Sequence, residues 1–552
     1  MAKVKITGHA SGSGVFTITA PNSNTDRTIT LPDASVTLGT DATKLPLAGG
    51  TMTGAIVLGT NTVGGLQITT TATSNIGLGS TAVNSITTGD YNVGLGLSAL
   101  TNNTTGSQNT AVGESALAAN TTASHNTGLG SGALASNTTG HTNTAVGRAA
   151  LLLNTTGPEN VAFGNFSLDA NTTGASNTGV GAYSLSANTT GSFNTGIGEA
   201  ALLSNTTASY NTALGKDAAR ANTTGSRNTA VGKGALRTNI TTGDQTAVGY
   251  NALNLNVGNY NVAVGSYAFD AAGGAGNSVA IGYNALGANT GGSYNVAVGM
   301  NSLLTSTTAA NNTSVGYEAM KLNTTGASNT ATGYQALRAN TTAAHNTASG
   351  IYSLHANTTG ANNTAVGSQA LVVNTTASDN TAVGYQALKV NTTGASNSAF
   401  GSSAGASITT GSYNQSIGYN AQPLSATTSN QFTLGDANIG DLRCNDTSIS
   451  GLSDQRDKTE IVDSSYGLDF INTVQPRQFK WATREGNIKD GKTRLGFIAQ
   501  ELFTACNGNN DVLDLVLGEG TDKMEAKYGN LVPMLVKAIQ ELSAKVTALE
   551  NE

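Results

Sequence analysis

The chain carries little charge for its length. Asp, Glu, Lys and Arg account for 11% of its 552 residues, against about 25% in an ordinary soluble domain. The 26 basic and 32 acidic residues leave a net charge of −6. Such a balance offers no basic face to a nucleic acid, and it is too weak to keep a chain disordered by charge repulsion. We therefore expect no nucleic-acid partner.

Proline, cysteine and long apolar runs are also scarce. Seven prolines against 69 glycines exclude collagen, which needs abundant proline. Cys444 and Cys506 are too few to cross-link the chain, and no CxxC or histidine-rich cluster predicts zinc, so we expect neither a metal nor a cofactor. No apolar run reaches the roughly 18 residues of a membrane-spanning helix, and the first residues lack a signal-peptide pattern. These absences predict a protein that is made in a cytoplasm and does not insert into a membrane.

The charge that is present is concentrated towards the C-terminus. The last 100 residues, from Ser453 onwards, hold 12 of the 26 basic and 16 of the 32 acidic residues. The preceding part is rich in Gly, Asn, Thr, Ser and Ala instead. The chain therefore joins two parts of different composition near residue 450.

Most of the first part is a repeat of 17 residues. The consensus Asn-Thr-Thr-Gly-x-x-Asn-Thr-Ala-Val-Gly-x-x-Ala-Leu-x-x recurs over residues 86–421 in about twenty copies, with one slip of a single residue. The anchor asparagines are Asn103, Asn120, Asn137, Asn154, Asn171, Asn188, Asn205, Asn222 and Asn239, then Asn289, Asn323, Asn340, Asn357, Asn374 and Asn391. This period is too short for a pair of helices and is typical of one turn of a β-solenoid.

The residues of one unit suit such a turn. Thr110–Gly113 is a short β-prone run, and we expect it to place Val112 inside. Ala116 and Leu117 form a second inward contact, while Asn-Thr-Thr-Gly and Gly113 supply turn residues that tolerate positive φ. No unit buries enough to fold alone, so stacking must spread one thin core along an axis. At about 4.8 Å per turn, twenty turns extend over roughly 95 Å.

Two sets of side chains in the repeat are candidates for binding or catalysis. Tyrosines that follow the strand glycine recur in phase and predict an exposed row, which we expect to pack turn on turn; they are Tyr250, Tyr283, Tyr317, Tyr334 and Tyr385. Acidic residues occur once per unit or less, whereas a glycosidase needs two carboxylates at a fixed separation. We therefore expect a solvated surface position for Glu114, Asp169, Glu199, Asp217, Asp270, Glu318 and Asp379.

The units resemble the head repeats of trimeric autotransporter adhesins, especially at residues 277–286, Asn-Ser-Val-Ala-Ile-Gly-Tyr-Asn-Ala-Leu. That family forms left-handed parallel β-rolls packed as trimers, so the resemblance implies an elongated homotrimeric β-roll. The period of 17 residues is slightly longer than that family's usual unit, which leaves a looser trimeric fold open. No membrane-anchor strands follow the repeat, although an autotransporter would need them.

Residues 1–60 are predicted to be an attachment segment and residues 61–85 a linker. Alternation at 15–21 and 27–34 predicts two β-strands with a turn between them. These stretches and residues 45–56 resemble segments of bacteriophage tail fibres. The resemblance implies a particle-proximal end that binds phage tail or baseplate proteins.

Residues 453–552 carry the most specific pattern. The motif Ser-Asp-x-Arg-x-Lys at 453–458 is followed by apolar and aromatic stretches at 468–471, 476–481 and 494–502 and by a terminal helix. This run resembles the intramolecular chaperone auto-processing domain of phage tail spikes and fibres, of the endosialidase type. The resemblance implies an α+β domain that trimerises the preceding fibre and then cuts itself off, with residues 422–452 as the distal tip.

By the same resemblance, Ser453 is the nucleophile and Lys458 the base, and the scissile bond is Leu452–Ser453. Asp454 and Arg456 belong to the motif without an assigned step. A serine hydroxyl needs a base within hydrogen-bond reach, and the segment contains no histidine, which excludes a Ser-His-Asp triad within it. A lysine can serve when burial or a neighbouring cation lowers the lysine pKa from about 10.4. The spacing alone also fits a Ser453 that merely caps a helix.

The last residues have heptad spacing, which predicts a short coiled coil. Its seam consists of Leu535, Ile539, Leu542, Val546 and Leu549. Pro533 suits the first turn of this helix. In isolation the seam favours dimers, so the expected trimer follows from the resemblance and not from the seam.

Together these features predict a homotrimeric bacteriophage tail fibre, located in the virion, that attaches to a host surface glycan or protein receptor. Self-cleavage by a serine–lysine pair, acting only on its own chain, is the one reaction predicted. The alternatives are a bacterial trimeric surface adhesin, a capsule depolymerase, and an ice-binding solenoid with rows of threonines.

Overall fold

A computed structural model describes residues 74–436 except 256 and 272, residues 438, 439, 443, 453–482, 491–518 and 524–552, and the backbone of three short strands before residue 68. The chain divides into two units, residues 1–63 and 64–552. In the first unit, β1 (Val15–Thr17) pairs antiparallel with β2 (Thr28–Thr30). The two strands expected in this segment are thus confirmed.

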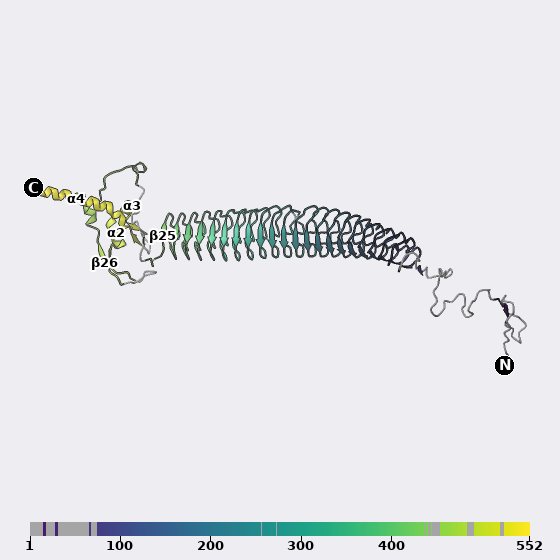
Figure 1. Cartoon of the computed structure of the whole chain (residues 1–552). Helices are drawn as coiled ribbons and strands as arrows, with labels where there is room; N and C mark the ends of the chain where they lie inside the picture. Colours follow the sequence, from purple (N-terminus) through teal and green to yellow (C-terminus); the bar gives the residue numbers. More distant parts are fainter. Residues whose placement is uncertain are drawn as a thin grey trace, which may run out of the picture. The chain divides into compact units, whose positions relative to one another are not determined.

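The second unit contains a β-solenoid of about 21 turns, and each turn contributes one short strand to a single sheet (Figure 1). The strands are β3 (Leu66–Gln67), β4 (Ile76–Leu78), β5 (Val93–Leu95), β6 (Thr110–Val112), β7 (Thr127–Leu129), β8 (Thr144–Val146), β9 (Val161–Phe163), β10 (Thr178–Val180), β11 (Thr195–Ile197), β12 (Thr212–Leu214), β13 (Thr229–Val231), β14 (Thr246–Val248), β15 (Val262–Val264), β16 (Val279–Ile281), β17 (Val296–Val298), β18 (Thr313–Val315), β19 (Thr330–Thr332), β20 (Thr347–Ser349), β21 (Thr364–Val366), β22 (Thr381–Val383), β23 (Ser398–Phe400), β24 (Gln415–Ile417) and β25 (Phe432–Leu434). β3 pairs antiparallel with β4, and the later neighbours pair in parallel up to β24 and β25. Among the pairings of the described residues none joins β25 back to β3, so the sheet runs open in chain order.

Neighbouring strands are held in register by the repeat. Thr110 of β6 lies opposite Thr127 of β7, one period of 17 residues further on. One step is a residue shorter, because Thr246 of β14 lies opposite Val262 of β15. This shorter turn is the slip seen in the sequence. The predicted mainly β solenoid with a 17-residue period is confirmed.

The core of the solenoid is thin and consists mainly of alanine and leucine. Ala111, at the centre of β6, is fully buried, as are Ala116 and Leu117 on the return pass. The prediction that Val112 lies inside is wrong, because side chains alternate along a strand and Thr110 and Val112 both face outward, partly exposed. Only the central side chain points inward, and in nearly every strand that residue is Ala, Gly or Ser.

Two asparagines per turn are buried beside this core, and each forms a ladder along the solenoid. In the first asparagine ladder, made by the anchor residues, the Asn120 amide donates to Asn103 Oδ1 at 2.8 Å and to the carbonyl of Ala123 at 2.9 Å. In the second asparagine ladder, which directly precedes the strands, the backbone N–H of Asn126 donates to Asn109 Oδ1 at 3.0 Å. A buried polar group left without a partner costs about 1–3 kcal/mol. Stacking therefore satisfies amides that an isolated turn would leave unpaired.

The turns require a left-handed backbone at particular positions. Gly113 has a φ of 131°, and a Cβ placed there would lie 2.6 Å from the carbonyl of Gly130 in the next turn, so this glycine is needed as expected. The Asn-Thr-Thr-Gly segment does not adopt positive φ, so that prediction is wrong; its asparagine is used in the ladder instead. In most turns the other left-handed residues are not glycines, as Gln108, Ser115 and Leu117 show with φ of 58°, 57° and 52°; Gly132 and Gly234 are exceptions.

The C-terminal region is small and α+β, as predicted. Its elements are η1 (Gln455–Asp457), α1 (Leu468–Ile471), β26 (Arg477–Phe479), β27 (Arg494–Gly496), α2 (Ala499–Cys506), α3 (Asn510–Leu513), β28 (Val516–Leu517), β29 (Glu525–Ala526), η2 (Tyr528–Leu531) and α4 (Val532–Glu550). β26 pairs with β27 and β28 with β29, both antiparallel. The backbone N–H of Leu468 donates to the Glu541 carboxylate at 2.8 Å and ties α1 to α4. No helix in the described part of the chain is long and apolar enough to span a bilayer.

A gap in the first asparagine ladder provides a test of its contribution to stability. Ser306 occupies an anchor position and is fully buried, and its hydroxyl has no hydrogen-bond partner among the described residues. Ser306→Asn should place an amide between Asn289 and Asn323 that bonds to both. We expect the free energy of unfolding to rise by about 1–2 kcal/mol, measured as a shift of the denaturation midpoint of the full chain.

The matched control removes an amide where the ladder is complete. Asn340 donates to Asn323 Oδ1 at 2.7 Å and accepts from Asn357 at 3.2 Å. Asn340→Ser should therefore lower the midpoint. A Ser306→Asn chain that is no more stable than the parent would show that the ladder does not stabilise the stack.

Candidate functional site

The serine and lysine singled out by the sequence lie side by side at the start of the C-terminal region. Lys458 Nζ donates a hydrogen bond to Ser453 Oγ at 2.5 Å. Both residues are exposed in the single chain. A nucleophile and a base in direct hydrogen-bond contact have the geometry that serine catalysis requires. Leu452, the residue before the predicted scissile bond, lies outside the described residues.

Asp454 and Arg456 form the turn that brings this pair together. Asp454 Oδ1 accepts the backbone N–H of Arg456 at 2.9 Å and caps η1, and its carboxylate pairs with the Arg456 guanidinium at 2.5 Å. The hydrogen bonds from Arg456 hold the pKa of Asp454 below its usual range. The helix cap is thus Asp454 and not Ser453, which leaves the serine hydroxyl in contact with Lys458.

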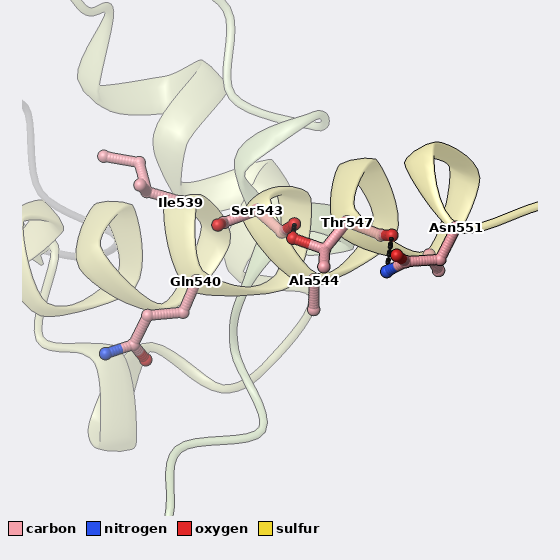
Figure 2. A pocket seen from close by; sticks show the side chains of 7 residues that line it. Ile539, Gln540, Ser543, Ala544, Thr547 and Asn551 are labelled. Atoms are coloured by element: carbon pink, nitrogen blue, oxygen red, sulfur yellow. Dashed lines mark hydrogen bonds between the residues drawn. The ribbon is translucent and has the colours of Figure 1, made fainter.

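The heptad residues of α4 form an exposed apolar row. The row consists of Leu535, Ile539, Leu542, Val546 and Leu549, which are 43% to 71% exposed. On the neighbouring face, Met534 and Ala538 are buried in the region's core. Figure 2 shows the outer part of the same helix, where Thr547 Oγ1 donates to the Ser543 carbonyl at 3.0 Å and Asn551 to the Thr547 carbonyl at 2.7 Å. These polar side chains bond within the helix, so the apolar row is the face available to another helix.

The predicted row of tyrosines is present on the solenoid. Tyr317 and Tyr334, on successive turns, stack with ring centroids 5.2 Å apart, and Tyr334 meets Tyr352 edge to face at 5.4 Å. Tyr317 and Tyr334 remain 39% and 41% exposed. Both expectations, exposure and packing of turn on turn, are confirmed for these rings. Because the stacked faces cover each other, this row contributes mainly to packing.

Glu318 departs most from the predicted solvated surface, and Asp169, Asp217 and Asp270 are partly buried as well. The Glu318 side chain is only 8% exposed and pairs with Lys321 at 2.6 Å and Arg338 at 2.8 Å. The hydrogen bond from Lys321, together with Arg338, holds the pKa of Glu318 below its usual range. This carboxylate is therefore held in an ion-pair network. In the described part of the chain no group of three His, Cys, Asp or Glu side chains could hold a metal ion.

Sequence reasoning missed an apolar stripe on the outer face of the sheet. The third residue of nearly every strand is aliphatic or aromatic and faces outward; we call this row the outer apolar stripe. Its most exposed members, at 37% to 56%, are Leu78, Leu129, Phe163, Ile197, Leu214, Val264, Ile281, Val366, Phe400, Ile417 and Leu434. Polar residues interrupt it at Thr332 and Ser349. The repeat itself shows an apolar residue at the third strand position of almost every unit. The sequence pattern of one unit, however, predicted a core position for that residue, Val112.

The comparisons with known proteins bear on the C-terminal region. No curated protein and no solved structure matches the chain. Residues 453–509, however, match the family model described as the chaperone of endosialidase, and this match begins at Ser453 itself. The chain therefore combines a β-solenoid of stacked 17-residue turns with a C-terminal segment of the endosialidase-chaperone type.

Proposed function

We propose that this protein is a tail-fibre-like attachment protein of a bacteriophage, in which the solenoid is the shaft and the C-terminal region is a self-removing chaperone. The observation that carries the proposal is the position of the family match. It starts at the residue whose hydroxyl contacts Lys458, C-terminal to a repetitive β shaft whose last strand ends at Leu434. The matched family is also named as a peptidase family, which agrees with a serine–lysine pair acting on the chain itself.

The geometry supports a two-step cleavage before Ser453. Ser453 Oγ attacks the carbonyl carbon of Leu452 while the neutral Lys458 amine takes the hydroxyl proton. The carbon–nitrogen bond breaks, the proton passes to the freed amino group of Ser453, and the acyl group rests on Oγ as an ester. Water then hydrolyses this ester, which leaves a carboxylate on Leu452 and restores the serine hydroxyl.

Assembly of several copies would favour this chemistry. In the single chain Ser453 and Lys458 are exposed, and Arg456 is already paired with Asp454. Only the neutral amine of a lysine can accept the serine proton, and removal of water disfavours the charged form. We infer that packing of neighbouring copies over this pair couples cleavage to correct assembly.

Two exposed apolar surfaces support association of identical copies, and the number three is carried over from the resemblance. The outer apolar stripe follows the sheet over about 21 turns, or roughly 100 Å. Exposed apolar surface of this extent, even with the interruptions at Thr332 and Ser349, marks an interface. A second copy in parallel register presents an identical stripe, and the exposed row of α4 offers each copy a place to begin the association.

A removable chaperone suits the folding problem of the shaft. Parallel turns must close long loops before they gain contacts, so such a stack folds slowly. Its unpaired edges meanwhile invite aggregation. A helical region that associates early would set the register and the number of chains. After its release the shaft would persist because unfolding is slow.

Replacement of the serine and lysine tests the cleavage. Ser453→Ala should leave a full-length chain, because the nucleophile is gone. Lys458→Arg keeps a positive charge but cannot act as a base, so it should also abolish cleavage. Intact mass spectrometry should find a chain that ends at Leu452 in the purified parent and in the control Ser465→Ala. It should find only full-length chain in Ser453→Ala and Lys458→Arg. Cleavage of the Ser453→Ala chain would refute the assignment.

Refolding tests the chaperone role. The Ser453→Ala precursor retains the C-terminal region, so after denaturation and dilution it should recover its β circular dichroism and its assembled mass. The mature shaft lacks the region and should aggregate or stay unfolded under the same conditions. Equal recovery of both would remove the chaperone role and leave the cleavage result unaffected.

Charge placed on the outer apolar stripe tests the trimer. The double variant Ile197→Glu with Leu214→Glu brings like charges together in a packed interface, so the mature shaft should fall from three times the chain mass to the mass of one chain. Thr207→Glu is the control, because Thr207 is exposed in a turn away from the sheet. Sedimentation measures the mass. A parent of single-chain mass, or a double variant that remains assembled, would contradict the proposed interface.

A further inference from the structure

The residue directly before the second asparagine ladder forms an exposed column along the solenoid, which we call the pre-asparagine column. Its members share a left-handed backbone with φ between 55° and 64°. They are Ser74, Tyr91, Gln108, His125, Thr142, Glu159, Ser176, Phe193, Tyr210, Arg227, Asp244, Tyr260, Asn277, Tyr294, Asn311, Ser328, His345, Asn362, Asp379, Ser396, Tyr413 and Asn430. The next residue is buried in the ladder, so these side chains project away from the core.

Many residues in this column, although not its Asn and Asp members, conflict with local backbone preference. Left-handed φ favours Gly, Asn and Asp and costs roughly 1–2 kcal/mol for other residues. Bulky side chains at such positions are unusual and point to a role other than folding. At Leu117 burial in the core explains the conformation. Phe193, Tyr210 and Tyr260 are 53%, 60% and 61% exposed, so packing in the core does not explain them.

Five successive turns bring the most distinctive residues of this column together. Phe193 and Tyr210 stack with ring centroids 5.2 Å apart and planes at 8°. Arg227 on the next turn forms a two-point ion pair with Asp244, with Nε and Nη2 at 2.6 Å and 2.8 Å from the two carboxylate oxygens. Tyr260 follows one turn later. We call Phe193, Tyr210, Arg227, Asp244 and Tyr260 the five-turn patch.

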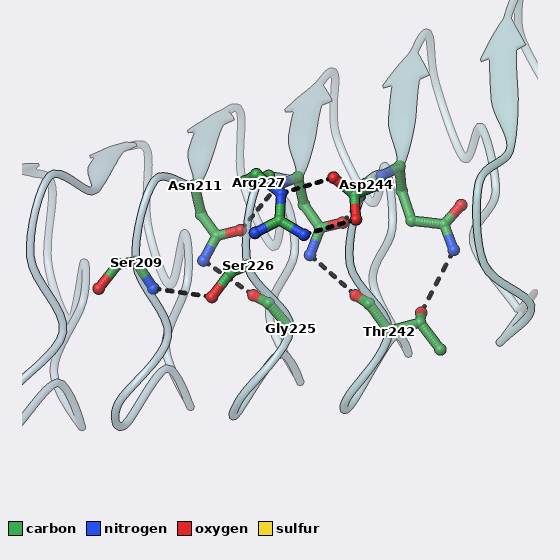
Figure 3. Close-up of polar contacts among 9 residues, drawn as sticks. Ser209, Asn211, Gly225, Ser226, Arg227, Thr242 and Asp244 are labelled. Carbon is green, nitrogen blue, oxygen red and sulfur yellow. Dashed lines mark hydrogen bonds and ion pairs between the residues drawn. The ribbon is translucent and has the colours of Figure 1, made fainter.

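The backbone beneath this patch is fixed. The backbone N–H groups of Arg227 and Asp244 donate to carbonyls of the preceding turn at 3.2 Å and 3.1 Å. Figure 3 shows the ion pair beside the amide of Asn211, which donates to the Gly225 carbonyl at 2.9 Å. The ladder thus holds the side chains on a rigid support, and a rigid surface loses little entropy when it binds a ligand.

We propose that the five-turn patch binds a neutral oligosaccharide of the host cell surface, an inference that rests on the attachment function proposed above. The aromatic rings offer apolar surface to the C–H faces of sugars, and the ion pair offers N–H donors and carboxylate acceptors to sugar hydroxyls. Tyr and Arg are also the residues most often dominant in binding surfaces.

The net charge and the length of the five-turn patch define the class of ligand that it would bind. Arg227 is neutralised by Asp244, and the guanidinium holds the pKa of Asp244 below its usual range, so the pair is a dipole and not a free cation. A dipole favours uncharged hydroxyl-rich sugars over acidic ones. From Phe193 to Tyr260 the patch spans four turn spacings, or about 19 Å, which suits an extended chain of several sugar units.

Binding of the full chain to immobilised glycans tests the site. The probes are neutral hexose oligosaccharides of four or more units and uronic-acid oligosaccharides of the same length. The parent should bind members of the neutral set, and Tyr210→Ala and Arg227→Ala should each weaken that binding at least tenfold. Tyr413→Ala is the matched control, because Tyr413 is an exposed, left-handed tyrosine of the same column outside the patch. It should bind like the parent.

Adsorption of the same proteins to a panel of intact bacterial cells separates the two proposals. If the parent adsorbs to cells and the patch variants adsorb equally well, the attachment role stands and the five-turn patch is refuted. Preference of the parent for the acidic probes, or binding to no glycan probe, also refutes the patch. If the parent adsorbs to no cell of the panel, the attachment function fails as well.

Discussion

Most turns of the solenoid bury two asparagine side chains, and a buried amide is tolerated only when its donors and acceptor are bonded. Here the partners come from the same residue of the neighbouring turn, as between Asn103 and Asn120. Asn120 also donates to the Ala123 carbonyl of its own turn, but its Nδ2 donates to Asn103 and its oxygen accepts from Asn137. The ladders therefore bind the turns to one another and to a single register. A sheet whose strands have three residues gains much of its order from this constraint, since each strand alone pairs through very few backbone groups.

The same constraint distinguishes the buried positions of each turn, which hold the stack together, from the exposed positions. Inside, the small central residues of the strands, the leucines of the return pass and the two ladders vary little from turn to turn. Outside, the third strand position is consistently apolar and the pre-asparagine column is chemically diverse. One face therefore suits association with identical neighbours, and another can carry different side chains on successive turns. The repeat allows this variation because exposed positions do not take part in the amide ladders.

The C-terminal region differs from the solenoid in its composition and in the contacts that stabilise it. It is charged, has its own small core around Leu502, Cys506 and Leu515, and ends in a helix with an unpartnered apolar row. Its serine–lysine pair is brought together by a capped turn of three residues, so the contact of Ser453 with Lys458 is local and does not depend on the shaft. Such a region can fold and associate before the long stack is complete, which is the order of events that the proposed maturation requires.

The sequence by itself determined the period, the β-solenoid, the slip of one residue and the helix that begins near Pro533, because each follows from short-range pattern and spacing. The α+β C-terminal region and the choice of Ser453 and Lys458 came from the resemblance of residues 453–552 to a known domain, since the spacing of the two residues alone also fits a helix cap. Tertiary structure decided which side of each strand is inside: Val112 faces out because the close stack admits only the small Ala111 at the centre. It likewise decided that Glu318 is covered, that the asparagines serve as ladder rungs and not as left-handed turn residues, and that Phe193, Tyr210 and Arg227 share one surface. These properties depend largely on contacts between neighbouring turns, and only the stacking of turns creates those contacts.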